Sequence, residues 1–162
     1  MIRLALISFL FVAGCSHSIQ SAKVSKDNSE MLYGEISEEQ LYFDYPNWKE
    51  MEVQYNPNPD VTAKISEFKG NLNVQVFLGT WCGDSRRNVP RFLKSIANTD
   101  NLHLQIWAVD RHKKLDNALT EKYQIKRVPT FIFLNDTVEI GRITEHPVKT
   151  IEEDILEILN RS

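Results

Sequence analysis

The chain has 162 residues, a formal net charge of −3 and two cysteines; 42% of its residues are hydrophobic and 25% are charged. These proportions exclude wholesale disorder, and the length suits one domain. The mild acidity without a long basic run argues against nucleic-acid binding, and two cysteines are too few for a disulfide scaffold or a four-cysteine zinc site.

The first fourteen residues have the pattern of a secretory signal peptide. Arg3 supplies the positive charge, the stretch from Leu4 to Ala13 is apolar except for Ser8, and small residues follow. A spanning helix needs about 20 apolar residues, so this stretch is too short for a transmembrane anchor. A buried amino-terminal helix is the alternative.

The end of this segment, Val12-Ala13-Gly14-Cys15, resembles the lipobox of bacterial lipoproteins. The resemblance implies cleavage before Cys15 and a diacylglycerol on its sulfur, which would attach the protein to a membrane of the bacterial cell envelope, facing the periplasm. Ser16, where some inner-membrane lipoproteins have aspartate, favours the outer membrane. An ordinary cleaved signal with a chance cysteine stays open. Residues 15–30, rich in Ser, Lys and Asn, are predicted to form a flexible tether.

Residues 31–59 are predicted to form an extension that packs onto the core. Ser37 can cap a short helix, with Gln40 at the third position after it. Prolines at 46, 57 and 59 should break any long element. The segment has too many aromatic residues for a free linker: Tyr33, Tyr42, Phe43, Tyr45, Trp48 and Tyr55.

From residue 60 to 162 the hydrophobic pattern switches repeatedly between helical and strand periodicity. Strands separated by helices should lie parallel, while the last two strands are predicted to form an antiparallel hairpin. The fold class is therefore α/β, a mixed four-stranded sheet with helices on both faces. Helices are predicted over 60–68, 85–97 and 115–123 and from a capping box at Thr150, and strands over 74–78, 102–108, 130–134 and 138–143.

Cys82 is predicted to lie where the first of these strands meets its helix. Unpaired backbone N–H groups and the helix dipole stabilise an anion at a helix start, so a thiolate there is more available as a nucleophile. Arg86 and Arg87 should act in the same direction, Asp84 should oppose them, and the Ser85 hydroxyl can bond the sulfur.

The segment around Cys82 strongly resembles the thioredoxin superfamily. The matching features are the Trp81-Cys82-Gly83 block after a buried strand, Pro90 in the next helix, and Val128-Pro129-Thr130 before a later strand. The resemblance implies a thioredoxin-like fold over residues 60–162, with Pro129 cis and beside Cys82. The Gly141-Arg142-Ile143 and Glu145-His146-Pro147 segments are similar to a bacterial subgroup of these proteins.

Two departures from the family pattern restrict the chemistry. Ser85 stands where the family has its second cysteine, and Val76 stands where a buried acid is usual. Cys82 can therefore attack a disulfide but cannot release itself, which implies a monothiol route such as isomerisation or removal of a small-thiol adduct. A domain that binds peptides without redox chemistry is the alternative. A shared iron–sulfur cluster, as in monothiol glutaredoxins, is disfavoured.

The resemblance assigns a role to each residue of the site. Cys82 is the nucleophile, Trp81 shields it, Ser85 and Arg86 stabilise the thiolate, and Pro129 shapes the groove. Gly83, Asp84, Val128, Thr130 and Arg86 are predicted to contact the substrate. We expect no cofactor and no metal, because the four histidines lack ligand spacing. The expected partners are protein thiols or disulfides, or small thiols, and we expect a monomer.

Overall fold

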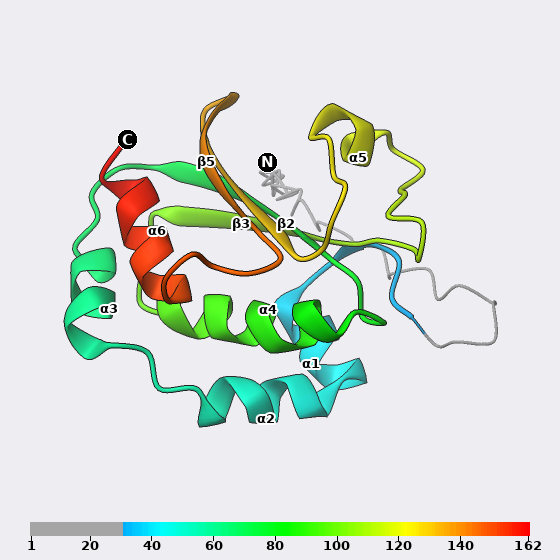
Figure 1. Ribbon diagram of the computed structural model, residues 1–162, viewed down its shortest axis with the longest axis horizontal. Coiled ribbons are helices and arrows are strands. Elements are labelled where there is room, and N and C mark those ends of the chain that lie inside the picture. The colour runs from blue at the N-terminus through cyan, green and yellow to red at the C-terminus, as the bar shows by residue number, and fades with distance from the viewer. Residues whose placement is uncertain (1–30) are drawn as a thin grey trace, which may run out of the picture.

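The computed structural model describes residues 31–162 (Figure 1). The predicted signal peptide, lipid-bearing Cys15 and tether fall within residues 1–30, outside the described part. The elements, in chain order, are β1 (Gly34–Ile36), α1 (Glu38–Asp44), α2 (Pro46–Gln54), α3 (Pro59–Ser66), β2 (Leu72–Leu78), α4 (Gly83–Ile96), β3 (Leu102–Ala108), α5 (Leu119–Lys122), β4 (Thr130–Asn135), β5 (Val138–Thr144) and α6 (Ile151–Leu159).

A five-stranded mixed sheet in the order β1-β3-β2-β4-β5 organises the domain. The α/β class is confirmed, as are the parallel pairing of β2 with β3 and the antiparallel β4–β5 hairpin. The sheet has one strand more than the four predicted, because β1 from the extension pairs antiparallel with the end of β3.

The direction of β4 differs from the prediction, since β4 runs antiparallel to β2. A parallel arrangement requires the connection to run back along the whole sheet. The four-residue helix α5 advances only about 6 Å, whereas a seven-residue strand is about 23 Å long. The connection stays at the end where β3 finishes, since Thr130 pairs with Phe77 near the end of β2.

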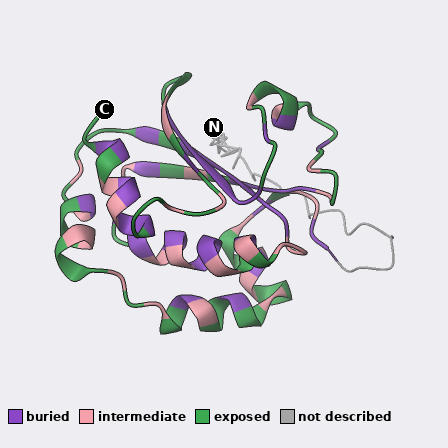
Figure 2. Ribbon diagram, viewed as in Figure 1, coloured by how far each residue is buried: buried purple, intermediate pink, exposed green. Residues whose placement is uncertain are grey.

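Alternate residues of the strands face two separate layers of the core. On one face, Val74, Val76 and Leu78 pack against α1, α2, α3, α4 and α6; on the other, Phe77 packs against α5 and the chain around it. Figure 2 shows the central strands and the inner sides of these helices as buried. Helices therefore cover both faces of the sheet, as predicted, but unequally.

The extension contributes to the larger core layer. Leu41 of α1 and Trp48 of α2 are almost completely buried, whereas the Phe43 side chain is 83% exposed. Ser37 caps α1 by accepting from the Gln40 N–H at 3.0 Å. Pro46 does not break structure, because it begins α2 at the first helical position, where proline needs no N–H partner.

Two further helix starts can be compared with the sequence. The capping box at Thr150 and Glu153 is present at the start of α6, as predicted. The helix predicted from residue 60, where Asp60 has the pattern of a cap, instead has Asn58 as its cap, because Pro59 takes the first helical position and the Asn58 side chain accepts from the Asp60 N–H. Within residues 31–162, no helix has the length and apolar character needed to cross a membrane.

A buried carboxylate joins the extension to α6. Glu152 is 2% exposed and accepts from the Tyr55 hydroxyl at 2.6 Å and the Asn58 N–H at 3.0 Å. Burial alone would raise the pKa of Glu152, but the hydrogen bonds from Asn58 and Tyr55 outweigh burial and hold the pKa below its usual value. The ionised form is thus the one the fold stabilises.

We expect Glu152→Gln to lower the free energy of unfolding at pH 7 by about 1–3 kcal/mol, because buried hydrogen bonds to a charged group are lost. Since the folded pKa is lowered, this contribution is present above the unfolded pKa of about 4.3 and disappears as the pH falls through the folded value. Urea unfolding should show a difference in the free energy of unfolding between the unaltered protein and Glu152→Gln at pH 7. This difference should shrink as the pH is lowered. Glu157→Gln, on the exposed side of α6, is the control and should change stability less.

Candidate functional site

The turn between β2 and α4 places Cys82 at the N-cap of a fourteen-residue helix. Its N–H donates to the Gly79 carbonyl at 2.9 Å, and its backbone is extended (φ −94°, ψ 126°). The Cys82 side chain makes no capping hydrogen bond to the first turn of α4. The N–H groups of that turn are therefore available to stabilise a negative charge on the half-buried Cys82 sulfur.

The loop before β4 faces this sulfur. The Val128–Pro129 peptide bond is cis, as expected, and the Cys82 thiol donates to the Val128 carbonyl at 3.3 Å. Val128 and Thr130 are each 2% exposed, and the Thr130 hydroxyl donates to the Arg127 carbonyl at 2.8 Å. Their side chains therefore hold the loop in shape, and contact with a substrate is left to backbone atoms.

The Ser85 hydroxyl has a different partner from the one predicted. It is fully buried and accepts from the Gly79 N–H at 3.2 Å, and the hydrogen bonds within residues 31–162 include none between it and Cys82. Arg86 is exposed, and its backbone N–H bonds to the Cys82 carbonyl. A Cβ added at Gly83 would meet nothing within 4 Å, so the surface beside Cys82 is open.

Trp81 is held in place by its indole N–H, which donates to the Val109 carbonyl at 3.0 Å. The Arg111 guanidinium and the Lys113 ammonium lie over the same ring, 5.7 and 5.9 Å from its centroid. In the sequence, the run Arg111-His112-Lys113-Lys114 at the end of a strand has only the pattern of a solvated basic loop. Nothing in the spacing of these residues signals the contact, because the contact depends on how the turn after β3 folds back.

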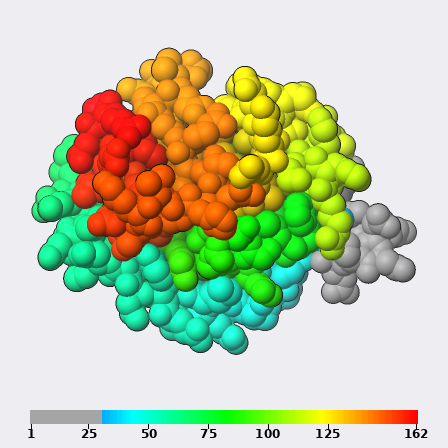
Figure 3. Space-filling model, in the orientation of Figure 1, coloured from blue at the N-terminus to red at the C-terminus, as the bar shows by residue number. Residues whose placement is uncertain are grey.

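The loop after β5 lies against the cis-proline loop and the start of α4. The Glu145 N–H donates to the Pro129 carbonyl at 2.7 Å, and the Asn88 side chain donates to the Glu145 carbonyl at 2.6 Å. Glu145 also pairs with Arg127 at 2.7 Å. Figure 3 shows the chain after β5 (orange) against α4 (green) on the surface. Glu145 thus shapes a loop that contacts the cis-proline loop beside Cys82.

Asp84, predicted to contact the substrate, is engaged within the protein. Its carboxylate pairs with Arg87 at 2.8 Å, and Arg87 also contacts the Nδ1 atom of His146 at 2.9 Å. The Arg87 guanidinium therefore offsets the negative charge of Asp84, the acid nearest to Cys82 in the sequence.

The extension reaches the site from its other side. The Leu32 N–H donates to the Thr80 hydroxyl at 3.3 Å, and the Tyr33 hydroxyl donates to Asp116 at 2.9 Å. Tyr33 packs in the same apolar cluster as Trp81 and Cys82.

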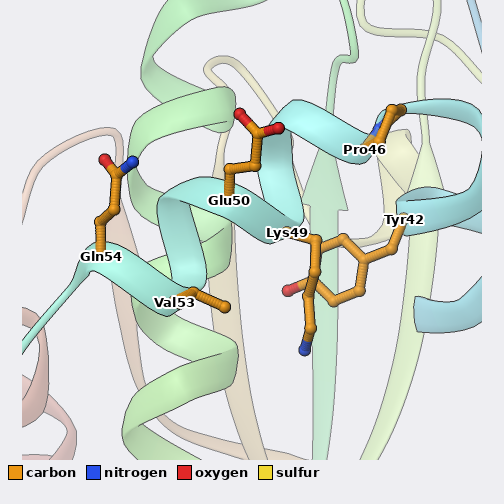
Figure 4. A pocket seen from close by; sticks show the side chains of 6 residues that line it. All are labelled: Tyr42, Pro46, Lys49, Glu50, Val53 and Gln54. Atoms are coloured by element: carbon orange, nitrogen blue, oxygen red, sulfur yellow. The ribbon is translucent and has the colours of Figure 1, made fainter.

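Two other features lie away from Cys82. Within the described residues, no group of three or more His, Cys, Asp or Glu side chains could hold a metal ion. An open surface hollow on the outer side of α1 and α2, seen in Figure 4, includes none of the predicted site residues; it is lined by Tyr42, Pro46, Lys49, Glu50, Val53 and Gln54.

Comparison with known proteins agrees with this geometry. A family model described as Thioredoxin matches residues 36–156. The chain belongs to the thioredoxin family. The match begins within the extension, 24 residues before the thioredoxin-like segment predicted from residue 60.

Solved structures resemble this chain at low sequence identity. An HIV epitope-scaffold protein matches with a TM-score of 0.55 and 16% identity, over 72% of this chain and 82% of that one. A protein of unknown function from Pseudomonas aeruginosa has a TM-score of 0.53 and 16% identity, over 72% and 79%. A thioredoxin pre-protein of Schistosoma mansoni is 24% identical over 62% of this chain and 90% of its own, with a TM-score of 0.42.

Proposed function

We propose that this thioredoxin-family protein carries out thiol–disulfide exchange through Cys82 alone. The observation that carries the proposal is the position of the Cys82 sulfur, which lies at the start of α4 and 3.3 Å from the carbonyl before the cis proline. Membership of the thioredoxin family supports the same chemistry, with protein thiols or disulfides as the general class of partner.

In the first step, the Cys82 thiol loses its proton to solvent and the thiolate attacks a disulfide of the partner. A bond forms between Sγ and one partner sulfur, the partner's own S–S bond breaks, and the second partner sulfur leaves as a thiolate. The first-turn N–H groups of α4 stabilise the attacking thiolate. No electrons are gained or lost overall, because one disulfide replaces another.

In the second step, a thiol from outside the domain must release the mixed disulfide. Ser85 occupies the position from which a resolving cysteine would act, and Cys82 is the one cysteine of residues 31–162. The partner's second thiol, or a small thiol, attacks the partner sulfur and frees Cys82. Isomerisation and removal of small-thiol adducts fit this cycle, and a dithiol reductase cycle does not.

A second candidate is a peptide-binding module without redox chemistry. The buried Ser85 hydroxyl favours it, because its bond to Gly79 makes it part of the backbone framework rather than of a reactive pair. The fully buried Val76, where the family has an acid, points the same way.

Trapping of mixed disulfides separates the two candidates. We expect the full chain, expressed in a bacterial envelope and alkylated rapidly, to carry disulfide-linked partners that reducing agent releases and Cys82→Ala lacks completely. Cys82→Ser is the matched control for side-chain size and polarity and should also lack them. Absence of adducts from the unaltered chain under both oxidising and reducing conditions would favour the binding module.

For the location, we propose that a lipid on Cys15 anchors the protein in the bacterial envelope, facing the periplasm. The lipobox-like Val12–Cys15 sequence supports this proposal. Metabolic labelling with an alkyne-bearing fatty acid should mark the unaltered chain and leave Cys15→Ala unlabelled. Equal labelling of both would contradict a lipid on Cys15.

A further inference from the structure

We propose that the disulfide attacked by Cys82 belongs to an acidic polypeptide, with carboxylates flanking the sulfur pair. This inference rests on the proposed exchange reaction and adds its substrate class. The supporting feature is a set of three cations around Cys82, which we term the cationic patch: Arg86, Arg111 and Lys113.

Two members of the patch lie over Trp81, the residue next to Cys82 in the chain. The Arg111 guanidinium is 5.7 Å and the Lys113 ammonium 5.9 Å from the centre of the indole ring. The ring itself is fixed by its bond to the Val109 carbonyl. Cation–π attraction therefore holds both charges next to the reactive residue.

The backbone of the turn after β3 fixes the position of these cations. The Lys113 N–H donates to the Asp110 carbonyl at 2.9 Å, and the Lys114 N–H donates to the Asp110 carboxylate at 2.7 Å. Lys113 has a φ of 60°, in the left-handed region that ordinary residues seldom adopt. The turn is thus a specific structure that presents Arg111 and Lys113 together.

The third member, Arg86, projects from the first turn of α4 and is exposed. None of the ion pairs within residues 31–162 involves a member of the patch. Of the acids near the site, Asp84 pairs with Arg87 and Glu145 with Arg127. Asp110 and Asp116, in and just after the turn, take part in none of these ion pairs, so the three cations of the patch outnumber these two carboxylates. Positive charge is therefore left over beside Cys82.

This excess opposes the charge of the protein as a whole. Residues 110–127 contain six Lys or Arg against three Asp or Glu, although the whole chain has a net charge of −3. A local field opposite in sign to the net charge attracts an anionic ligand to one face and orients it there. This local charge favours the approach of an acidic ligand on the side of Cys82.

The layout of the patch fits an extended ligand better than a small one. Arg86 comes from α4, whereas Arg111 and Lys113 come from the turn after β3, so the charges lie on two separate segments beside Cys82. The surface at Gly83 is open. A chain with acidic residues on both sides of its cysteine can contact both segments at once.

The test uses three synthetic peptides of equal length, each with one cysteine protected as a 2-thiopyridyl disulfide. The residues beside the cysteine are acidic, neutral or basic. Attack by Cys82 forms a protein–peptide disulfide and breaks the peptide–pyridyl S–S bond. The leaving thiolate takes up a proton and becomes pyridine-2-thione, whose absorbance gives the rate.

We expect the acidic peptide to react roughly tenfold faster than the neutral one, and the basic peptide more slowly than both. The differences should shrink in 1 M salt, where the screening length falls to about 3 Å. Arg111→Gln combined with Lys113→Gln should bring the reaction rate of the acidic peptide close to that of the neutral peptide. Arg86→Gln alone should lower the rate of the acidic peptide only in part.

The matched control is Lys64→Gln combined with Lys69→Gln, which removes two exposed cations around the end of α3, away from the start of α4 (Figure 1). It should keep the preference for the acidic peptide. Equal rates for the three peptides would overturn the acidic-substrate inference while leaving the exchange reaction intact. Reaction with none of them would overturn both.

A lipid surface is the competing use of such a patch. Equal peptide rates together with patch-dependent binding to phosphatidylglycerol vesicles would assign the cations to a membrane and overturn the inference. A preference for the acidic peptide that is undiminished both in the Arg111→Gln/Lys113→Gln protein and in Arg86→Gln would overturn it as well, because the preference would then come from elsewhere.

Discussion

Replacing Ser85 by cysteine (S85C) is expected to give a protein that reduces insulin, if Cys82 carries out the proposed exchange. Cys82 is the N-cap of α4 and position 85 is its third residue, so the two side chains are neighbours on the helix surface. A thiol held in that position attacks the mixed disulfide within the same molecule. Intramolecular attack has a high effective concentration, so we expect turnover with dithiothreitol as donor to rise by roughly a hundredfold or more.

The same helix offers a matched control for this gain. Ser95 is also buried, at 3% exposed, and its hydroxyl donates to the Arg91 carbonyl. Ser95→Cys adds a thiol to α4 far along the helix from Cys82. It should leave insulin reduction at the level of the unaltered protein. If Ser85→Cys gains no more than Ser95→Cys, the site is not built for exchange.

Ser85→Cys also carries a structural cost that can be measured separately. The Ser85 hydroxyl accepts from the buried Gly79 N–H, and sulfur is a weaker acceptor. We expect the reduced variant to lose about 1 kcal/mol of unfolding free energy. Thiol counting in a glutathione redox buffer should show Cys82 and the introduced thiol oxidising together, which a poorly folded protein would not do selectively.

Trp48→Ala is expected to have the largest effect on stability. Trp48 is 1% exposed, packs in the main core layer and lies 6.0 Å from Tyr45 between ring centroids. Truncating a buried Trp or Phe to alanine typically removes about 3–5 kcal/mol, because transfer energy is lost and a cavity remains. Urea unfolding followed by circular dichroism measures the change.

Val53 provides the comparison on the same helix. Its side chain is 64% exposed, so Val53→Ala should change the free energy of unfolding by no more than about 0.5 kcal/mol. A loss of less than about 1 kcal/mol for Trp48→Ala would mean that α2 is an appendage. The expected loss would make residues 31–59 part of the cooperative fold.

The elements that bury a regular apolar face could be predicted from the sequence. Val89, Phe92, Leu93 and Ile96 follow helical spacing, and all four are buried in α4. Strand β3 spans 102–108, as its alternation predicts. Strand β1 and helix α2 could not be predicted from the sequence, for different reasons. β1 is too short to show a period, and Pro46 has the pattern of a breaker although it starts α2.

The candidate site was predictable only where local sequence determines it. Cys82 at the helix start and the cis bond at Pro129 follow from motifs in the chain, and the structure brings them together. The pair of Asp84 with Arg87 has i,i+3 spacing on α4 and could have been predicted, whereas the partner of Ser85, the Gly79 N–H, depends on how the turn between β2 and α4 folds. The same holds for the two cations on Trp81, which are fixed by a turn and a tertiary ring contact.

The route by which the chain enters the domain has a practical consequence. Leu32 is bonded to Thr80, two residues before Cys82, whereas the C-terminus follows α6 at the other end of the sheet (Figure 1). A fluorophore, affinity tag or fusion partner joined just before residue 31 would sit beside the thiol and obstruct large substrates. The same group joined after Ser162 would leave the face around Cys82 clear, so immobilisation through the C-terminus leaves Cys82 accessible from solution.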